Sequence, residues 1–144
     1  MRKASVVLAI LLALPLSACA RDCAPRVEGG WIRLMPGGMP MQAGFGRIAH
    51  PCPMPATIVS ASSPAYGKVE LHESRLVDGV NRMREVPELR IAPDAAAVLR
   101  PGGLHLMLMQ PRAELKPGSR VAIVFTLKDG RELVGEFEAR KPAP

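Results

Sequence analysis

The sequence predicts a single all-β domain, folded as a β-sandwich or a small barrel. Its 144 residues suit one domain, because domains cluster around about 100–150 residues. Fifteen prolines and thirteen glycines are spread along the chain, and both residue types disfavour the interior of long helices. With 48% hydrophobic and 22% charged residues, the chain has enough apolar material to bury a core, which excludes an intrinsically disordered protein.

Short apolar or alternating runs, separated by turn residues, indicate the strands of this fold. In chain order the predicted strands are residues 31–35, 44–49, 56–62, 68–74, 81–86, 96–99, 104–109, 120–127 and 132–139. Tripeptides with Pro, Gly or both separate them at 36–38, 51–53, 101–103 and 116–118, and Asp-Gly pairs do so at 78–79 and 129–130. Nothing longer than one turn of helix is expected.

The two Asp-Gly pairs predict two-residue hairpins of type I′, which need positive φ at both loop positions. In the hairpin around residues 78–79, counting outward from the loop sets His72 opposite Glu85. Met83 then lies one diagonal step from His72 on the same face, because side chains two apart on a strand share a face. Long side chains on diagonal neighbours are close enough to reach one ion.

The run 104–109 has two chemically different faces. Three leucines alternate with His105, Met107 and Met109, so that one face is apolar and the other carries an imidazole and thioethers. Imidazole and thioether together form a soft, largely neutral ligand set, which suits Cu(I) better than Zn²⁺, Mg²⁺ or Ca²⁺. The alternative is that these are ordinary structural side chains of a strand.

The N-terminal segment predicts export. Arg2 and Lys3 precede an apolar run at 4–16 that is too short to span a membrane and has the layout of a secretory signal. Leu-Ser-Ala-Cys at 16–19 resembles the bacterial lipobox, in which Cys19 is acylated and becomes the first mature residue. Ordinary cleavage after Ala20 is the alternative, and either route places the mature protein outside the cytoplasm.

The expected organisation follows from that cleavage. It consists of a signal peptide at 1–18 (1–20 for ordinary cleavage), a short tether at 19–27, one folded domain at 28–140 and a frayed tail at 141–144.

Three cysteines fit an oxidising compartment. If Cys19 carries lipid, Cys23 and Cys52 remain as a pair, and a disulfide is expected. The alternative is a metal site at His50-x-Cys52, which has only two ligands in a Pro-rich loop.

Charge and motif content exclude two classes of function. Loss of Arg2 and Lys3 lowers the formal net charge from +6 to +4, and the remaining basic residues are scattered among acidic ones. With aromatic residues at 3% to stack bases, a nucleic-acid partner is not expected. No nucleophile–base constellation or pair of carboxylates stands out, so the protein is not expected to be an enzyme.

The spacing His72-x10-Met83-x21-His105-x-Met107 resembles the copper-binding motif of the periplasmic copper chaperone family PCuAC. The flanking sequences Val-Glu-Leu-His-Glu at 69–73 and Leu-Arg-Pro-Gly-Gly-Leu-His-Leu-Met-Leu at 99–108 are similar as well. The resemblance extends over about residues 28–139.

This resemblance implies a cupredoxin-like barrel that binds one Cu(I) through two His and two Met side chains. It implies a chaperone that delivers copper during cytochrome oxidase assembly, to an oxidase copper subunit or a Sco-type thiol protein. The expected location is the periplasm of a Gram-negative bacterium, with a lipid anchor on Cys19. Whether Cu(II) is carried, and whether the other methionines bind copper, is left open: Met35, Met39, Met41, Met54 and Met109.

Two alternatives remain from the sequence. The protein is a β-sandwich lipoprotein that only binds other proteins, or it is a copper electron-transfer protein. A blue-copper site needs a Cys thiolate, and no cysteine lies between His72 and Met107, which argues against the second alternative.

Overall fold

A computed structural model describes residues 23–143, and these residues form an all-β domain. In chain order the strands are β1 (Arg26–Arg33), β2 (Met41–His50), β3 (Ala56–Ser62), β4 (Tyr66–Val77), β5 (Val80–Glu85), β6 (Leu89–Ile91), β7 (Ala95–Leu99), β8 (Leu104–Pro111), β9 (Arg120–Leu127) and β10 (Glu132–Arg140). Within the described part of the chain, no helix has the length and apolarity needed to cross a membrane. The predicted signal peptide and the lipid attachment site Cys19 lie outside the described residues.

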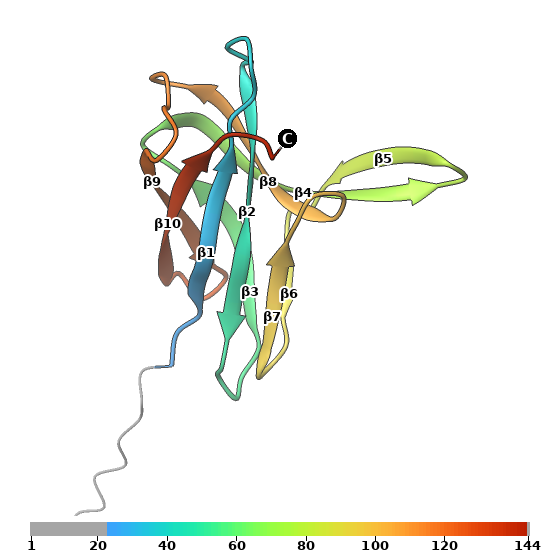
Figure 1. The fold of residues 1–144 in the computed structure, drawn as a ribbon. Helices are drawn as coiled ribbons and strands as arrows, with labels where there is room; N and C mark the ends of the chain where they lie inside the picture. Colours follow the sequence, from blue (N-terminus) through green and yellow to red (C-terminus); the bar gives the residue numbers. More distant parts are fainter. Residues whose placement is uncertain (1–22, 144) are drawn as a thin grey trace, which may run out of the picture.

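Seven strands close into a barrel in the order β4-β8-β2-β1-β10-β9-β3, and β3 pairs back to β4 (Figure 1). Strands β1 and β10 pair in parallel, whereas the other pairs are antiparallel. The remaining strands extend this barrel: β5 pairs with β4, β6 with β3, and β7 with β2. The prediction of a small all-β barrel is confirmed.

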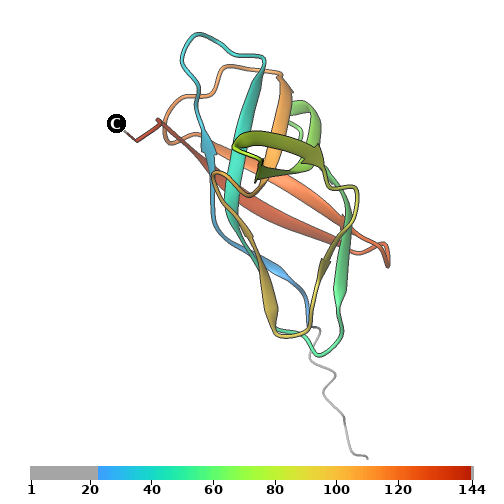
Figure 2. The same ribbon diagram turned by 90° about the vertical axis from the view of Figure 1, so that its right-hand side faces the viewer.

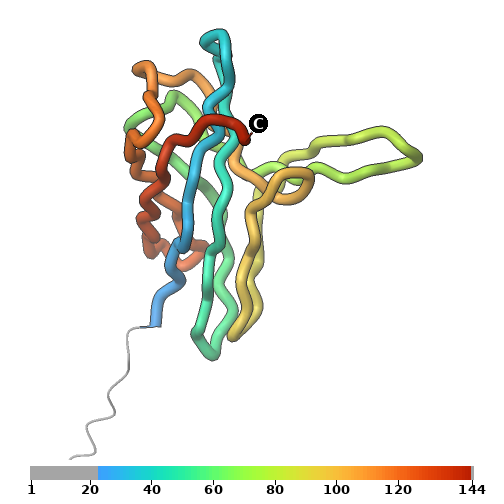
Figure 3. Tube along the Cα trace, viewed as in Figure 1, coloured from blue at the N-terminus to red at the C-terminus, as the bar shows by residue number. Residues whose placement is uncertain are grey.

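The hairpin of β4 and β5 projects away from the barrel as an arm, which we define as residues 73–85 (Figures 1 and 3). Viewed from the side of the arm, the barrel is elongated (Figure 2). The loop at residues 35–41 lies at the end opposite to the start of the described chain.

The barrel interior is filled by aliphatic and aromatic side chains. Among those with no exposed surface are Ile32, Ile58, Leu106, Leu108 and Phe125. Because successive residues of a strand point to opposite faces, the burial of alternate positions fixes which side chains point outward.

All nine predicted strands are present, and the bounds of β3 and β9 agree with the prediction. Strand β6 was not predicted, because three residues between prolines are too few to reveal an alternating pattern. Strand β1 begins at Arg26, before the predicted domain boundary at residue 28, and a register shift between Glu28 and Trp31 interrupts its pattern.

The first predicted hairpin is confirmed and the second is wrong. Asp78 and Gly79 have φ values of 50° and 75°, as a type I′ loop requires, and β4 and β5 pair in the predicted register. The second loop has three residues, 128–130, because the Leu127 N–H donates to the carbonyl oxygen of Arg131. There Gly130 alone takes positive φ, at 89°, as in a three-residue loop with a left-handed last position.

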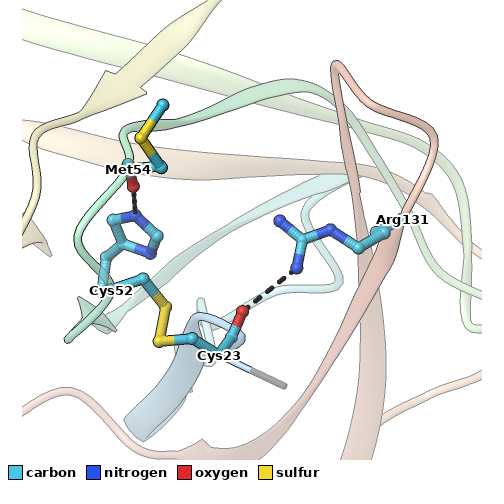
Figure 4. Close-up of a disulfide and its surroundings, with 5 residues drawn as sticks. Cys23, Cys52, Met54 and Arg131 are labelled. Atoms are coloured by element: carbon cyan, nitrogen blue, oxygen red, sulfur yellow. Dashed lines mark hydrogen bonds between the residues drawn. A yellow bond between two sulfur atoms is a disulfide. The ribbon is translucent and has the colours of Figure 1, made fainter. Parts of the chain in front are cut away.

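A disulfide joins Cys23 to Cys52, with their Cα atoms 5.5 Å apart (Figure 4). The Arg131 guanidinium donates to the carbonyl oxygen of Cys23 at 3.1 Å, which holds the start of the domain against the β9–β10 loop. The sulfur of Cys52 is therefore engaged with Cys23 in this structure, not with His50. Because Cys23 is bound to the barrel, the predicted tether does not extend as far as residue 27.

Candidate metal centre

Strands β4 and β8 place two histidines directly opposite each other. His72 pairs with His105, and the centroids of their rings are 6.1 Å apart. The neighbouring pair, Leu71 and Leu106, is buried in the core, with exposed fractions of 6% and 0%. The alternation of the strands therefore places both imidazoles on the outer face of the barrel.

The two methionines of the motif lie on the same face. Met107 follows His105 by two residues and is paired with Glu70 on β4. Met83 is paired with Ser74, which places it one diagonal step from His72 in the predicted register. The structure therefore brings the four residues to one face of the strands β5, β4 and β8.

His105 is held by the turn that precedes it. Its side chain is almost fully buried, and its Nδ1 lies 2.8 Å from the carbonyl oxygen of Gly103. Because a carbonyl oxygen only accepts hydrogen bonds, this contact assigns the proton of the neutral ring to Nδ1. The Nε2 atom then carries a lone pair that is available to a metal.

His72 is held by a neighbouring carboxylate. Its Nε2 lies 3.0 Å from Oε2 of Glu70, whose pKa is lowered by hydrogen bonds from Lys68 and from His72. The ionised carboxylate accepts the Nε2 proton, which leaves the lone pair on Nδ1. That Nδ1 atom is buried and has no hydrogen-bond partner within residues 23–143. A buried nitrogen without a partner is unfavourable, and a metal ion would satisfy it.

An aromatic cluster borders the centre on its β2 side. The ring centroid of Phe45 is 6.4 Å from that of His105 and 4.7 Å from that of Trp31. The guanidinium carbon of Arg33 lies 4.9 Å from the Phe45 centroid, within the range of a cation–π contact. These side chains shield His105 from one side.

Three neighbours of the centre were not predicted from the sequence: Glu70, Gly103 and Phe45. Glu70 carries a usable signal, because it is two residues before His72 and therefore on the same face. The Gly103 carbonyl is a backbone group with no side-chain signature. Phe45 reaches the centre only through the pairing of β2 with β8, which no local pattern reveals.

The other methionines of the described residues occupy three places. Met35 and Met39 line a hollow at the end of the barrel, together with Pro111 and Lys141. Met54 is 71% exposed, beside the disulfide. Met41 and Met109 are paired across β2 and β8, on the face that carries Met107.

The candidate centre offers two imidazole nitrogens and two thioether sulfurs, and we call it the His/Met centre: His72, Met83, His105 and Met107. All four are neutral in these tautomers, and such a set favours a soft monovalent cation. No group of three or more His, Cys, Asp or Glu side chains suited to a metal occurs in the described part of the chain.

The described chain is thus a closed all-β barrel that carries two histidines and two methionines on its outer face. The sequence matches the family described as "Putative lipoprotein LpqE-like" over residues 26–139, and the chain belongs to that family. The "Putative lipoprotein Lxx21020" of Leifsonia xyli subsp. xyli is 31% identical over 139 residues, which are 89% of this chain and 82% of that protein. The family name indicates an exported protein with a membrane anchor.

Solved structures with similar folds include PCuAC domains. The apo PCuAC domain from PmoF1 superposes with a TM-score of 0.69 at 18% identity, over 84% of this chain and 98% of that one. The solution structure of CuI-DR1885 from Deinococcus radiodurans has a TM-score of 0.66 at 26% identity, over 85% and 83% of the two chains. The cupredoxin-like fold and the resemblance to PCuAC are thereby confirmed. Family and fold also support the prediction that the protein is not an enzyme.

Proposed function

We propose that this protein is a copper chaperone that binds one Cu(I) through His72, Met83, His105 and Met107. The observation that carries the proposal is the opposed pair of imidazoles, each with a lone pair left by its own hydrogen bond, beside Met107. The Cu(I)-loaded relative from Deinococcus radiodurans, at 26% identity, supports the choice of metal.

Delivery proceeds by ligand exchange, without a change of oxidation state. Thioethers and imidazoles stabilise Cu(I), so the metal stays in its soft form while it is carried. Met83 is 54% exposed on the arm, whereas His105 is almost buried. The side of the centre that faces Met83 is therefore where an acceptor's ligand enters.

The acceptor and the location are part of the same proposal. An exported lipoprotein works at a membrane surface, and we place this one in the periplasm of a Gram-negative bacterium, anchored through Cys19. Multiple acyl chains give a stable anchor, whereas a single chain gives a marginal one. The acceptor is a copper protein of cytochrome oxidase assembly, either an oxidase copper subunit or a Sco-type protein.

An anaerobic Cu(I) competition titration tests the centre. It uses residues 23–144 with the disulfide intact, so that neither Cys23 nor Cys52 offers a thiol. The unchanged sequence is compared with the double variant Met83→Leu/Met107→Leu. We expect the double variant to lose the most tightly bound Cu(I) ion, because leucine replaces two of the four donor side chains of the centre and has no donor atom.

The matched control is Met35→Leu/Met54→Leu, which removes two exposed thioethers outside the centre. Its tightest equivalent should bind as in the unchanged protein. Equal binding by all three proteins would overturn the proposal and favour a lipoprotein that only binds other proteins.

A further inference from the structure

A second pair of thioethers lies on the outer face of the barrel, next to the His/Met centre. Met41 of β2 is directly opposite Met109 of β8, and the next pair on the same face joins Ala43 to Met107. Directly opposed side chains have Cβ atoms about 4.5–5.5 Å apart, so two flexible Met side chains can reach one ion between them. Met107 is two residues from Met109, roughly 7 Å along the strand.

These methionines do not fill the core. The core cluster of the described residues contains leucine, isoleucine, valine, phenylalanine, tyrosine and alanine, but no methionine. The inward positions of this part of β8 are Leu106 and Leu108, both without exposed surface. Met41 is 42% exposed, and Met109 is only partly buried. Packing of the interior therefore does not account for thioethers at these positions.

The backbone keeps the pair in register on both sides. The Ala43–Met107 pair precedes it, and beyond it the Gln110 N–H donates to the carbonyl oxygen of Pro40 at 3.0 Å. Ala43 has a small side chain, which leaves space on the β2 side of Met107. Three methionines therefore share this face, with Met107 and Met109 two residues apart on β8 and Met41 opposite Met109, and we call them the sulfur row.

The two charged residues of β4 beside this row neutralise each other. Lys68 is the β4 neighbour of Met109, and Glu70 is the β4 neighbour of Met107. Lys68 forms an ion pair with Glu70, so its ammonium group is compensated and the carboxylate lies toward the centre. A monovalent soft cation therefore meets a neutral donor set on the β4 side. On the β2 side, Arg33 is the β1 neighbour of Ala43, and its guanidinium lies over the rings of Trp31 and Phe45.

We propose that Met41 and Met109 form a second site for Cu(I), contiguous with the His/Met centre through Met107. Two thioethers bind Cu(I) more weakly than the mixed set of the centre, because they supply fewer donors and no imidazole. A weaker site at one end of the sulfur row provides a position from which Cu(I) moves to the centre by exchanging one thioether at a time. Met41 and Met109 lie outside the four-residue centre, so their binding of Cu(I) does not depend on that centre, whereas the onward transfer rests on the proposed function.

The test is an anaerobic Cu(I) titration of residues 23–144 carrying ¹³C in the Met ε-methyl groups, followed by NMR. In the unchanged protein we expect the methyl signals of Met41 and Met109 to shift with the second equivalent. The variant Met41→Leu/Met109→Leu should lose that equivalent and keep the first. The control Met35→Leu/Met54→Leu, which also removes two exposed thioethers, should keep both.

The two proposals fail in different ways. The variant His72→Ala/His105→Ala removes the centre, and it should still bind Cu(I) with shifts at Met41 and Met109. If binding is the same in the Met41/Met109 variant as in the unchanged protein, the second site is wrong, whatever happens at the centre. Shifts of Met35 and Met54 together with Met41 and Met109 indicate non-specific thioether binding and also overturn the proposal. The NMR signals of the unchanged protein decide the question even if a variant does not fold.

Discussion

The barrel wall and the arm each contribute to the candidate centre, but they hold their residues very differently. On the wall, His105 is 5% exposed, lies beside Phe45 and is hydrogen-bonded to the turn before it. On the arm, Met83 is 54% exposed, and every residue of its strand β5 is exposed. The candidate centre therefore combines a ligand that the barrel wall holds in place, His105, with an accessible ligand on the arm, Met83. This combination suits a protein that must bind a metal and also release it.

The largest contrast is expected in stability. Leu106 of the wall has no exposed surface, whereas Leu76 of the arm is 76% exposed. Leu106→Ala should lower the free energy of unfolding by about 2–5 kcal/mol, because it leaves a cavity in the core. Leu76→Ala should change it by less than about 0.5 kcal/mol. Chemical denaturation of residues 23–144 measures both, and similar losses would mean that the arm is part of the cooperative core.

The next contrast concerns Cu(I) affinity. His105→Leu should weaken binding by at least about 100-fold, the upper end of the loss caused by removing an outer-shell partner. Met83→Leu should weaken it by about tenfold, or about 1.4 kcal/mol, because an exposed ligand is more easily replaced. The His105 change keeps a similar volume, and the Gly103 carbonyl still accepts from the Ser74 N–H at 3.0 Å. A greater loss in the Met83 variant would reverse our assignment of the two halves.

The effect expected at Glu70 is smaller than that of His105→Leu, because Glu70 orients His72 without being one of the four ligands. Glu70→Ala should reduce Cu(I) affinity by about 10- to 100-fold, as loss of a partner behind a metal ligand does. Glu70→Gln should restore most of that affinity, since its side-chain oxygen still accepts the Nε2 proton. Equal losses in the two variants would show that Glu70 acts through its charge and not through orientation.

The smallest effect is expected from the ion pairs of the arm. Glu73 contacts Arg75 and Arg84, and hydrogen bonds from these two residues lower its pKa. A lowered pKa in the folded state gives a contribution that is present at neutral pH and is lost as the pH falls through that pKa. Arg75 and Arg84 are largely exposed, so solvent weakens both ion pairs. Glu73→Gln should therefore shift the denaturation midpoint only slightly at pH 7 and less at low pH. A large shift at pH 7 would show that the arm is stabilised by more than solvated pairs.

The arm hairpin was predictable because local signals agree with each other. The Asp-Gly loop and the alternation of β4 require the same register, so the positions of His72 and Met83 follow from counting. The loop at 128–130 was mispredicted because its local signal fits two loop lengths. An Asp-Gly pair also fits a three-residue loop, and the bond between the Leu127 N–H and the Arg131 carbonyl decides between the two.

The surroundings of the centre were not predictable from local patterns. Phe45 approaches His105 because β2 pairs with β8, and Arg131 reaches Cys23 across most of the chain. Such contacts depend on closure of the barrel. The sequence therefore indicates which residues face outward on a strand, but not which side chains from distant strands surround them.

The carbonyl oxygen of Gly103 accepts two hydrogen bonds, from the Nδ1 of His105 at 2.8 Å and from the backbone N–H of Ser74 at 3.0 Å. Ser74 is the residue opposite Met83 on the arm. The orientation of a buried imidazole and the position of an exposed thioether are therefore mechanically linked through one oxygen atom. A force that displaces the arm at Ser74 also acts on the acceptor that sets the ring of His105.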